Sequence, residues 1–298
     1  MIKRSVVIQN RCYVSVLNNQ LTIENRETGE MNSVPIEDVG YLEFESAQCT
    51  VTTAALSRLA AGGAVVVVCN QRYAPEAITL PLEGNTLHAE RIQMQVSAST
   101  PVKKRLWQQL VRCKIRNQAA VLKTMGLPHA TVARCATMVY TADRTNREAV
   151  AAKAYWQQLL KLYGVTRDPD GLYPNNFLNY GYAVLRSSVA RGLVRAGLHP
   201  ALGIHHSNRS NAFALADDVM EPYRPFADLH ILQFCATLVE PTELQPPHKK
   251  EILQLLVRDV QHSIGRRPLL NSVEVVCAQV AQTLGGSSTE PDLPILRA

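Results

Sequence analysis

Residues 202–225 have the sequence LGIHHSNRSNAFALADDVMEPYRP, and the rest of the chain is organised around them. The stretch begins with a histidine pair, His205 and His206, and the apolar spacing of its second half predicts a helix. On that helix Asp218 and Glu221 are three residues apart and share a face. Carboxylates on a helix beside a histidine-bearing loop are the components of a divalent-metal site, which points to a helical catalytic unit.

The same local pattern has a plainer interpretation. Carboxylates near the end of a helix often pair with arginine, and Arg209 and Arg224 are close in sequence. A histidine pair near a turn is more often structural than metal-binding. Pro222 and Pro225 predict that the helix ends just before them. A metal site therefore requires further ligands from elsewhere in the chain.

Length and composition indicate an ordinary globular protein. At 298 residues the chain is long enough for two domains. Its 46% hydrophobic and 19% charged residues exclude a disordered chain. The net charge of +6 and the pI near 9.0 favour an anionic partner such as nucleic acid, although many enzymes are mildly basic.

Cysteine usage and the terminal sequence predict a cytoplasmic protein without a membrane segment. The seven cysteines form no C-x-x-C pair and are odd in number, which suits buried reduced thiols better than disulfides or a zinc site. The amino terminus has too few consecutive apolar residues for a signal peptide. The longest apolar run, 60–69, is interrupted by Gly62-Gly63 and is too short to span a bilayer.

Residues 1–82 predict a small sandwich-like β domain with one helix, suited to holding or dimerising the protein. A turn signal at Asn18-Asn19 separates apolar runs that are rich in β-forming residues. The run 53–61 has helical spacing and ends at Gly62-Gly63, a favourable carboxyl cap. The expected strands are 4–8, 12–17, 21–24, 39–44 and 64–69.

Beyond residue 82 the pattern becomes helical, so the expected fold class is α+β with two domains. We expect a linker over 83–100, a larger all-α catalytic domain over 101–284 and a flexible tail over 285–298. The expected helices are 103–121, 175–196, 212–221, 229–239, 249–264 and 272–284.

The helix expected at 103–121 carries a row of basic residues. Arg105, Arg112 and Arg116 recur at intervals of seven and four, so they share one face. Such a stripe suits contact with a phosphate backbone. A solvated basic face without DNA contact is an equal alternative.

Glu148 also has two interpretations. Thr145-x-x-Glu148 fits a capping box, in which Glu148 would only close the start of a helix. Glu148 and Tyr155 also lie on one stripe of that helix, among alanines that would let a neighbouring helix approach closely. From local sequence alone, capping is the favoured role.

Four motifs in a fixed order resemble a known family. They are NREAVAAKAYW at 146–156, NYGYAVLR at 179–186, GLHPALGIHH at 197–206 and DVMEPYRPFAD at 218–228. The order and spacing closely resemble the family of CRISPR-associated protein one, the integrase of spacer adaptation, and the resemblance covers essentially the whole chain. The sequence around the histidines and the Met-Glu-Pro triplet is most similar to the branch of the family from type II systems.

The resemblance implies the metal ligands. The family's ligand positions fall on Glu148, His206 and Glu221, with Asp218 as an acidic neighbour that assists. His206 occupies the family position, and His205 beside it is the alternative. Other branches place Asp where this chain has Glu221, and either acid offers hard oxygen ligands. Two carboxylates with one imidazole suit Mg²⁺ or Mn²⁺.

The resemblance also implies a function and partners. It implies a metal-dependent DNA integrase/endonuclease that inserts captured DNA into a repeat array through attack by a 3′-hydroxyl. Two alternatives stay open: a metal-dependent nuclease that uses water, and a non-catalytic DNA-binding scaffold. Implied partners are double-stranded DNA, a second copy of the chain, the small CRISPR-associated protein two and the type II effector nuclease. Candidates for the site's surroundings or for DNA contact are Tyr155, Arg186, Asn208 and Arg209.

Overall fold

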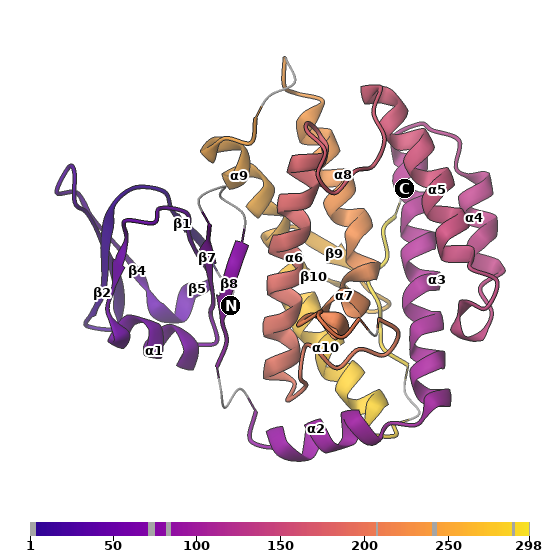
Figure 1. Ribbon diagram of the computed structural model, residues 1–298, viewed down its shortest axis with the longest axis horizontal. Coiled ribbons are helices and arrows are strands. Elements are labelled where there is room, and N and C mark those ends of the chain that lie inside the picture. Colours follow the sequence, from indigo (N-terminus) through magenta and orange to yellow (C-terminus); the bar gives the residue numbers. More distant parts are fainter. Residues whose placement is uncertain are drawn as a thin grey trace.

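The computed structural model describes residues 4–70, 75–81, 85–206, 208–239, 243–287 and 290–297. The strands of residues 4–79 gather at one end of the molecule, and the long helices lie at the other end together with a short hairpin of residues 259–268 (Figure 1). The expected α+β class, with β-structure first and helices after it, is therefore confirmed. No helix within the described ranges is long and apolar enough to cross a membrane.

The first sheet has the strand order β1-β5-β7-β8. Its first three strands run parallel to one another, and β8 pairs antiparallel with β7. The sequence of β7 is Val-Val-Val-Val-Cys, a continuous apolar run of the kind expected for a strand covered on both faces. The strands are β1 (Arg4–Ile8), β5 (Val39–Phe44), β7 (Val65–Cys69) and β8 (Pro75–Thr79).

The second sheet has the order β4-β3-β2-β6 and encloses a small core with the first. Asn18 and Asn19 both adopt positive φ, at 49° and 59°, and close the β2–β3 hairpin as predicted. Helix α1 (Thr53–Ala61) contributes Ala55 and Leu59 to this core, so the sandwich-like unit with one helix is confirmed. The strands are β2 (Cys12–Leu17), β3 (Gln20–Asn25), β4 (Met31–Pro35) and β6 (Thr50–Val51).

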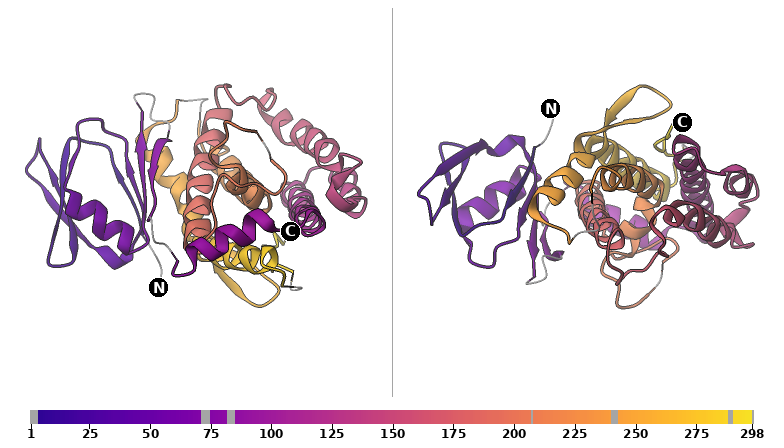
Figure 2. Two further views of the ribbon diagram at one scale, coloured as in Figure 1. Left: turned by 60° about the horizontal axis from the view of Figure 1, so that its bottom comes forward. Right: turned by 90° about the horizontal axis from the view of Figure 1, so that it is seen from above.

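The helical part is built around α6, which is packed against α7, α8, α9 and α10 (Figures 1 and 2). The 3₁₀ turns are η1 (Ile36–Asp38), η2 (Thr141–Asp143), η3 (Leu160–Tyr163), η4 (Glu221–Tyr223) and η5 (Gln254–Val257). The helices are α2 (His88–Ser97), α3 (Thr100–Thr124), α4 (Ala130–Thr137), α5 (Arg147–Leu159), α6 (Asn175–Arg195), α7 (Ala214–Met220), α8 (Arg224–Cys235), α9 (Pro246–Leu253) and α10 (Leu269–Leu284).

The expected helix at 249–264 is wrong. Helix α9 ends at Leu253, and a short antiparallel hairpin of β9 (Asp259–Gln261) and β10 (Arg266–Pro268) follows η5. The hairpin turns at Gly265, whose φ of 75° is readily adopted only by glycine. The carboxyl-terminal part is therefore predominantly helical rather than all-α.

The two prolines after Glu221 begin helical turns instead of ending a helix. Pro222 lies in the first turn of η4 and Pro225 in the first turn of α8, so the chain stays helical from α7 into α8. Proline fits the first turn because its missing N–H would have no intrahelical partner there. The prediction that these prolines stop the helix is therefore wrong.

The segment expected to be a linker, 83–100, contains a helix. The predicted boundary after residue 82 falls in 82–84, which lies outside the described residues. Within the described part of the segment, α2 is anchored by Gln95, whose side chain donates to the carbonyls of His199 and Leu202 at 3.0 and 2.9 Å. This segment therefore buttresses the loop that leads to the histidine pair.

The tail expected to be flexible, 285–298, is held against the helices over 290–297. The Leu296 N–H donates to Asn117 Oδ1 at 3.0 Å, and Ile295 forms a bridge with Gln261 of β9. Asn117 in turn donates to the carbonyl of Pro222 at 3.0 Å. These residues therefore form a strap that fastens α3 to η4, and the expectation of a mobile tail is corrected for them.

Two carboxylates of β5 and its extension are buried where the β unit meets the helices. Glu43 and Glu45 alternate with Leu42 and Phe44, so they share one face of the strand, and α6 and α9 cover that face (Figures 1 and 2). Glu45 pairs with Lys249 of α9 at 3.0 Å, and Glu43 accepts from the hydroxyl of Tyr180 of α6 at 3.0 Å. Burial raises the pKa of Glu43. A buried polar cluster therefore joins the two parts of the chain.

Replacing Glu45 by alanine is expected to destabilise the protein by about 3–5 kcal/mol, because the substitution removes the carboxylate that neutralises a buried ammonium. Urea unfolding followed by circular dichroism measures this change. The matched control is Glu24→Ala, which removes a surface carboxylate that pairs with Arg26 and should cost no more than about 1 kcal/mol. Equal losses in the two variants would refute a stabilising role for the buried pair.

Candidate metal centre

Glu148 and Glu221 converge on one lysine. Glu148 lies in the first turn of α5, Glu221 begins η4, and Lys114 projects from the middle of α3. The Lys114 Nζ atom is 2.6 Å from Glu148 Oε1 and 2.5 Å from Glu221 Oε2. The Lys114 side chain is only 10% exposed, so the ion pairs are largely screened from water. The structure thus brings two of the three predicted ligands together.

Glu148 does not cap its own helix. The backbone N–H groups of Arg147 and Glu148 both donate to the carboxylate of Asp143 at 2.9 Å. Asn146, in the left-handed conformation with φ of 50°, separates Thr145 from the helix start. The capping-box interpretation is therefore wrong. Because Asp143 performs this role, the Glu148 carboxylate is available to Lys114.

Glu221 is kept ionised by two cations. Arg224 Nε lies 3.0 Å from Glu221 Oε1, whereas Lys114 contacts the other oxygen, Oε2. Burial acts to raise the pKa of Glu221, but Arg224 and Lys114 outweigh it and lower that pKa. The Oε2 atom is buried and faces the Lys114 ammonium. A buried, ionised carboxylate oxygen that already contacts a cation suits a metal ligand.

His206 is oriented by Asp218. The His206 Nδ1 atom lies 2.6 Å from Asp218 Oδ1, and the same carboxylate accepts the backbone N–H groups of Ile204, His205 and His206. These four contacts use the usual acceptor capacity of a carboxylate. Asp218 therefore positions His206 and the loop that carries it. It leaves Nε2 as the His206 nitrogen that can bind a metal, an arrangement common around metal-binding histidines.

The loop packs tightly enough to require a glycine at 203. A Cβ atom there would collide with the carbonyl oxygen of His206 and crowd Asp218 Oδ2. The hydrogen bond that the His206 ring donates to Asp218 is the main cause that raises the pKa of His206, while burial opposes it. The glycine thus permits the close approach of loop and helix on which the histidine geometry depends.

His205 has a different environment from His206. Its ring stacks on Trp107 of α3 with a centroid separation of 4.1 Å and an interplanar angle of 4°. Trp107 also meets His206 edge-on at 5.7 Å. The stack gives His205 a packing role, which supports His206 as the ligand candidate of the pair.

No three His, Cys, Asp or Glu side chains in the described part of the chain converge closely enough to hold a metal ion. The reason lies in the contacts above: the Lys114 ammonium stands between the two glutamates, and His206 is turned towards Asp218. The donor set itself, two carboxylates and one imidazole, fits Mg²⁺ or Mn²⁺. The ligand assignment therefore continues below as a proposal.

Tyr155 belongs to a hydrogen-bond network that supports the site through Asp228. Its hydroxyl donates to Asp228 Oδ2 at 2.8 Å, and the hydroxyl of Tyr182 donates to Asp228 Oδ1. Arg224 lies over the Tyr182 ring, 4.7 Å from its centroid. Burial raises the pKa of Asp228 to about 6. This network fixes Arg224, which in turn contacts Glu221.

The candidate DNA-binding side chains differ in how exposed they are and in whether they already contact other groups of the protein. Arg112 donates through Nε and Nη2 to the Val139 carbonyl at 3.1 and 2.8 Å, so it fastens α3 to the connection before α5. Arg105 and Arg116 on the same helix are exposed. Arg186 pairs with Asp217 at 2.8 Å and is 45% exposed.

A hollow of about 390 Å³ opens beside His206. Asn208 and Arg209 are both exposed here, and Asn208 accepts the N–H of Ser210 at 3.1 Å in a local turn. The hollow's polar lining consists of Gln95, Lys103, His206, Asn208, Arg209 and Asn211. Basic side chains next to the imidazole suit a backbone phosphate.

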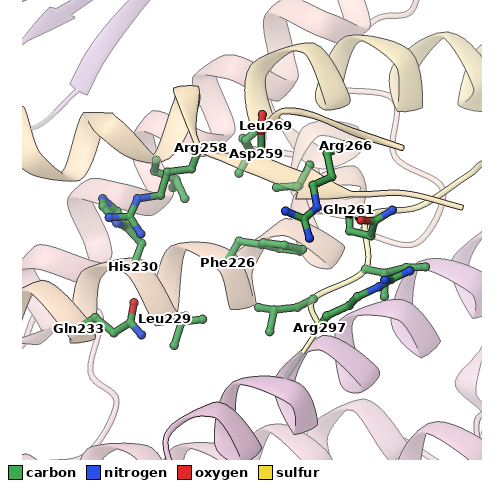
Figure 3. Close-up of a pocket in the computed structure, with 14 residues that line it drawn as sticks. Phe226, Leu229, His230, Gln233, Arg258, Asp259, Gln261, Arg266, Leu269 and Arg297 are labelled. Carbon is green, nitrogen blue, oxygen red and sulfur yellow. Dashed lines mark hydrogen bonds between the residues drawn. The ribbon is translucent and has the colours of Figure 1, made fainter. Parts of the chain in front are cut away.

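A second hollow, of about 250 Å³, lies between α8, the β9–β10 hairpin and the strap 290–297. Figure 3 shows Phe226 among the arginines of its lining, Arg258, Arg266 and Arg297. None of the candidate metal ligands lines it.

Substitutions of the three α3 arginines should have different effects on the salt dependence of DNA binding. Replacing Arg105 and Arg116 by alanine is expected to reduce the slope of log affinity against log salt by about one for each phosphate that is no longer neutralised. Arg112→Ala should leave the slope unchanged and lower stability, because its guanidinium is bound to Val139. Fluorescence anisotropy with a labelled duplex measures the slopes. A slope change confined to Arg112→Ala would reverse this assignment.

The fold and the acid–histidine cluster together define an α+β protein with its site in the helical part. The model of the family "CRISPR associated protein Cas1" matches residues 5–242. The chain belongs to this family, and the resemblance drawn from its motifs is confirmed. It is 37% identical over 255 residues to the CRISPR-associated endonuclease Cas1 of Neisseria meningitidis serogroup C, covering 85% of this chain and 83% of the relative.

Solved structures share the fold at low sequence identity. A casposase bound to integration product has a TM-score of 0.79 at 17% identity and covers 97% of this chain and 92% of its own. A Cas6-RT-Cas1–Cas2 complex gives 0.71 at 16% identity, with 98% of this chain and 36% of the other covered. A TtCas1-DNA complex gives 0.57 at 16% identity, with coverage of 97% and 94%.

Proposed function

We propose that the protein is a metal-dependent DNA integrase of CRISPR adaptation that inserts captured DNA into a repeat array through attack by a 3′-hydroxyl on a phosphodiester. The observation that carries this proposal is the meeting of Glu148 and Glu221 at one buried cationic point, beside an imidazole oriented by Asp218. The names of the relatives, an endonuclease and a casposase with its integration product, support it.

Each residue of the cluster has a proposed task. Glu148, Glu221 and the Nε2 atom of His206 would hold Mg²⁺ or Mn²⁺, and the nitrogen ligand favours Mn²⁺ somewhat. When bound, the ion would polarise the scissile phosphate and align the hydroxyl. Asp218 keeps His206 in the productive orientation, and Arg224 keeps Glu221 ionised.

The exposed basic groups would hold the DNA. Arg209 and Lys103 at the hollow, and Arg105 and Arg116 on α3, would neutralise backbone phosphates and add affinity without sequence preference. The similar structures of a Cas6-RT-Cas1–Cas2 complex and of a TtCas1-DNA complex support a small Cas2 partner and DNA as substrate. We further propose a homodimer, a type II setting supported by the Neisseria relative, with the effector nuclease as an additional partner, and a cytoplasmic location.

Strand transfer of a labelled short duplex into a supercoiled, repeat-bearing plasmid tests the proposal. The reaction would be run with Mn²⁺, with Mg²⁺ and with EDTA, each with and without Cas2. Joined product that requires the metal is the expected result. Binding without joining under every condition would favour a non-catalytic scaffold.

Hydrolysis is the second candidate function, because the Neisseria relative is named an endonuclease. The same three ligands would then serve a water molecule as nucleophile. The plasmid assay separates the two reactions, because hydrolysis releases shorter labelled strands while strand transfer moves the label onto the plasmid. Cleavage without any transferred label would replace the integrase proposal by the nuclease.

A further inference from the structure

We propose that Lys114 is an internal counter-ion that occupies the metal position in the metal-free protein, and that a divalent ion binds only by displacing it. This inference rests on the proposed function, because it takes Glu148 and Glu221 as the ligands. Its basis is the position of one ammonium nitrogen within 2.6 Å of an oxygen of each glutamate. A cation placed to neutralise both ligands stands where a bridging metal would bind.

The charges of the cluster are already balanced without a metal. Glu148 and Glu221 carry two negative charges, and Lys114 and Arg224 carry two positive ones. The Glu221 side chain is 5% exposed and that of Lys114 is 10% exposed, so water screens little of this interaction. A divalent ion added beside an unmoved Lys114 would leave an uncompensated double charge in a buried site, which is strongly unfavourable. Withdrawal of Lys114 would halve this excess charge, so metal binding is favoured when the lysine leaves.

The displaced ammonium has a side from which it can leave. Glu148 is 23% exposed and Glu221 only 5%, so the cluster opens towards water on the Glu148 side. In water the ammonium would give up its two carboxylate partners and gain only hydration. A DNA phosphate arriving at the site would supply a new anionic partner. Displacement of Lys114 is thus less costly when DNA is present.

Metal and DNA binding should therefore be coupled through Lys114. The Lys114 ammonium competes with the metal for the two glutamates. Because a DNA phosphate can pair with the displaced ammonium, DNA raises the affinity of the site for the metal. By thermodynamic reciprocity, the metal then raises the affinity for DNA by the same factor. Such a lysine would keep the site poorly loaded with metal until the substrate arrives.

The test is a calorimetric titration with Mn²⁺ alone, in the absence and presence of a short duplex. Lys114→Met removes the ammonium and keeps much of the side-chain volume. It is expected to bind Mn²⁺ about tenfold more tightly than wild type without DNA, and to show little further gain with DNA. Wild type is expected to gain about tenfold in Mn²⁺ affinity when the duplex is added.

Two further variants guard the titration against misfolding of Lys114→Met and against a general effect of losing a buried lysine. Lys114→Gln, also neutral but able to hydrogen-bond, replaces Lys114→Met if that variant does not fold. Lys249→Met removes a buried lysine that also pairs with a glutamate, but at the junction with the β unit. It should lower thermal stability and leave both Mn²⁺ affinity and its coupling to DNA at wild-type values.

The result separates this inference from the proposed function. In one outcome, wild type binds Mn²⁺, Glu148→Gln does not, and neither neutral Lys114 variant binds Mn²⁺ more tightly than wild type. That outcome would refute the displacement of Lys114 and would still support the proposed metal site. Absence of Mn²⁺ binding in wild type and all variants, with or without duplex, would overturn the proposed metal-dependent function itself. Tighter binding in the neutral variants supports both.

Discussion

Glu148→Gln is expected to lower strand joining by about a thousandfold or more while leaving DNA affinity within about twofold of wild type. The amide keeps the shape of the side chain but removes the negative charge that would bind the metal. A metal's stabilisation of a phosphoryl transition state is worth several kcal/mol, and every 1.4 kcal/mol is about a tenfold change in rate. DNA affinity rests mainly on basic groups and is expected to survive.

Joining rates and duplex anisotropy, measured on the same preparations, test this expectation. The matched control is Glu24→Gln, which alters a partly exposed carboxylate that pairs with Arg26 in the β unit. The control should retain wild-type joining. If Glu148→Gln also joined DNA at the wild-type rate, Glu148 would not be a ligand, whatever its interaction with Lys114.

His206→Ala is expected to reduce joining by about a hundredfold or more, whereas His205→Ala should stay within about tenfold of wild type. The difference follows from their surroundings: Asp218 orients His206 as a ligand, and Trp107 stacks on His205. Loss of the stack should instead lower stability by about 1 kcal/mol.

Single-turnover joining and thermal unfolding of both alanine variants distinguish the two roles. His206→Gln is a useful companion, because a polar side chain of similar reach remains without an imidazole nitrogen. Inactive His205→Ala together with active His206→Ala would move the ligand by one position. Equal inactivity of the two variants, each with normal stability, would assign chemistry to both rings.

Sequence reasoning identified the carboxylates and the histidine pair but not what holds them together. Lys114 had no signal of its own, because it is one basic residue on a helix that already carries several. Only the packing of α3 against η4 and α5 shows that it lies between the two glutamates. Asp143 was missed for a related reason: its carboxylate caps α5 across the irregular backbone around Asn146.

The fold was predictable where local patterns and tertiary packing agree. The expected strands of the β unit and the helix now described as α6 match the structure within a residue or two. The hairpin after α9 was not predictable, because its three-residue strands carry too short a pattern and the residues around them look amphipathic. The burial of Glu43 and Glu45 was not predictable either, since only the packing of α6 and α9 against the strand covers them.

The central claim is that Glu148, Glu221 and His206 bind one divalent ion, and anomalous scattering from crystals grown with Mn²⁺ and a short duplex tests it most directly. The account predicts one strong peak within bonding distance of an oxygen of each glutamate and of the Nε2 atom of His206, and Lys114 withdrawn from between the carboxylates. A peak bound by other residues, or none at saturating Mn²⁺ with Lys114 still between the glutamates, would contradict it.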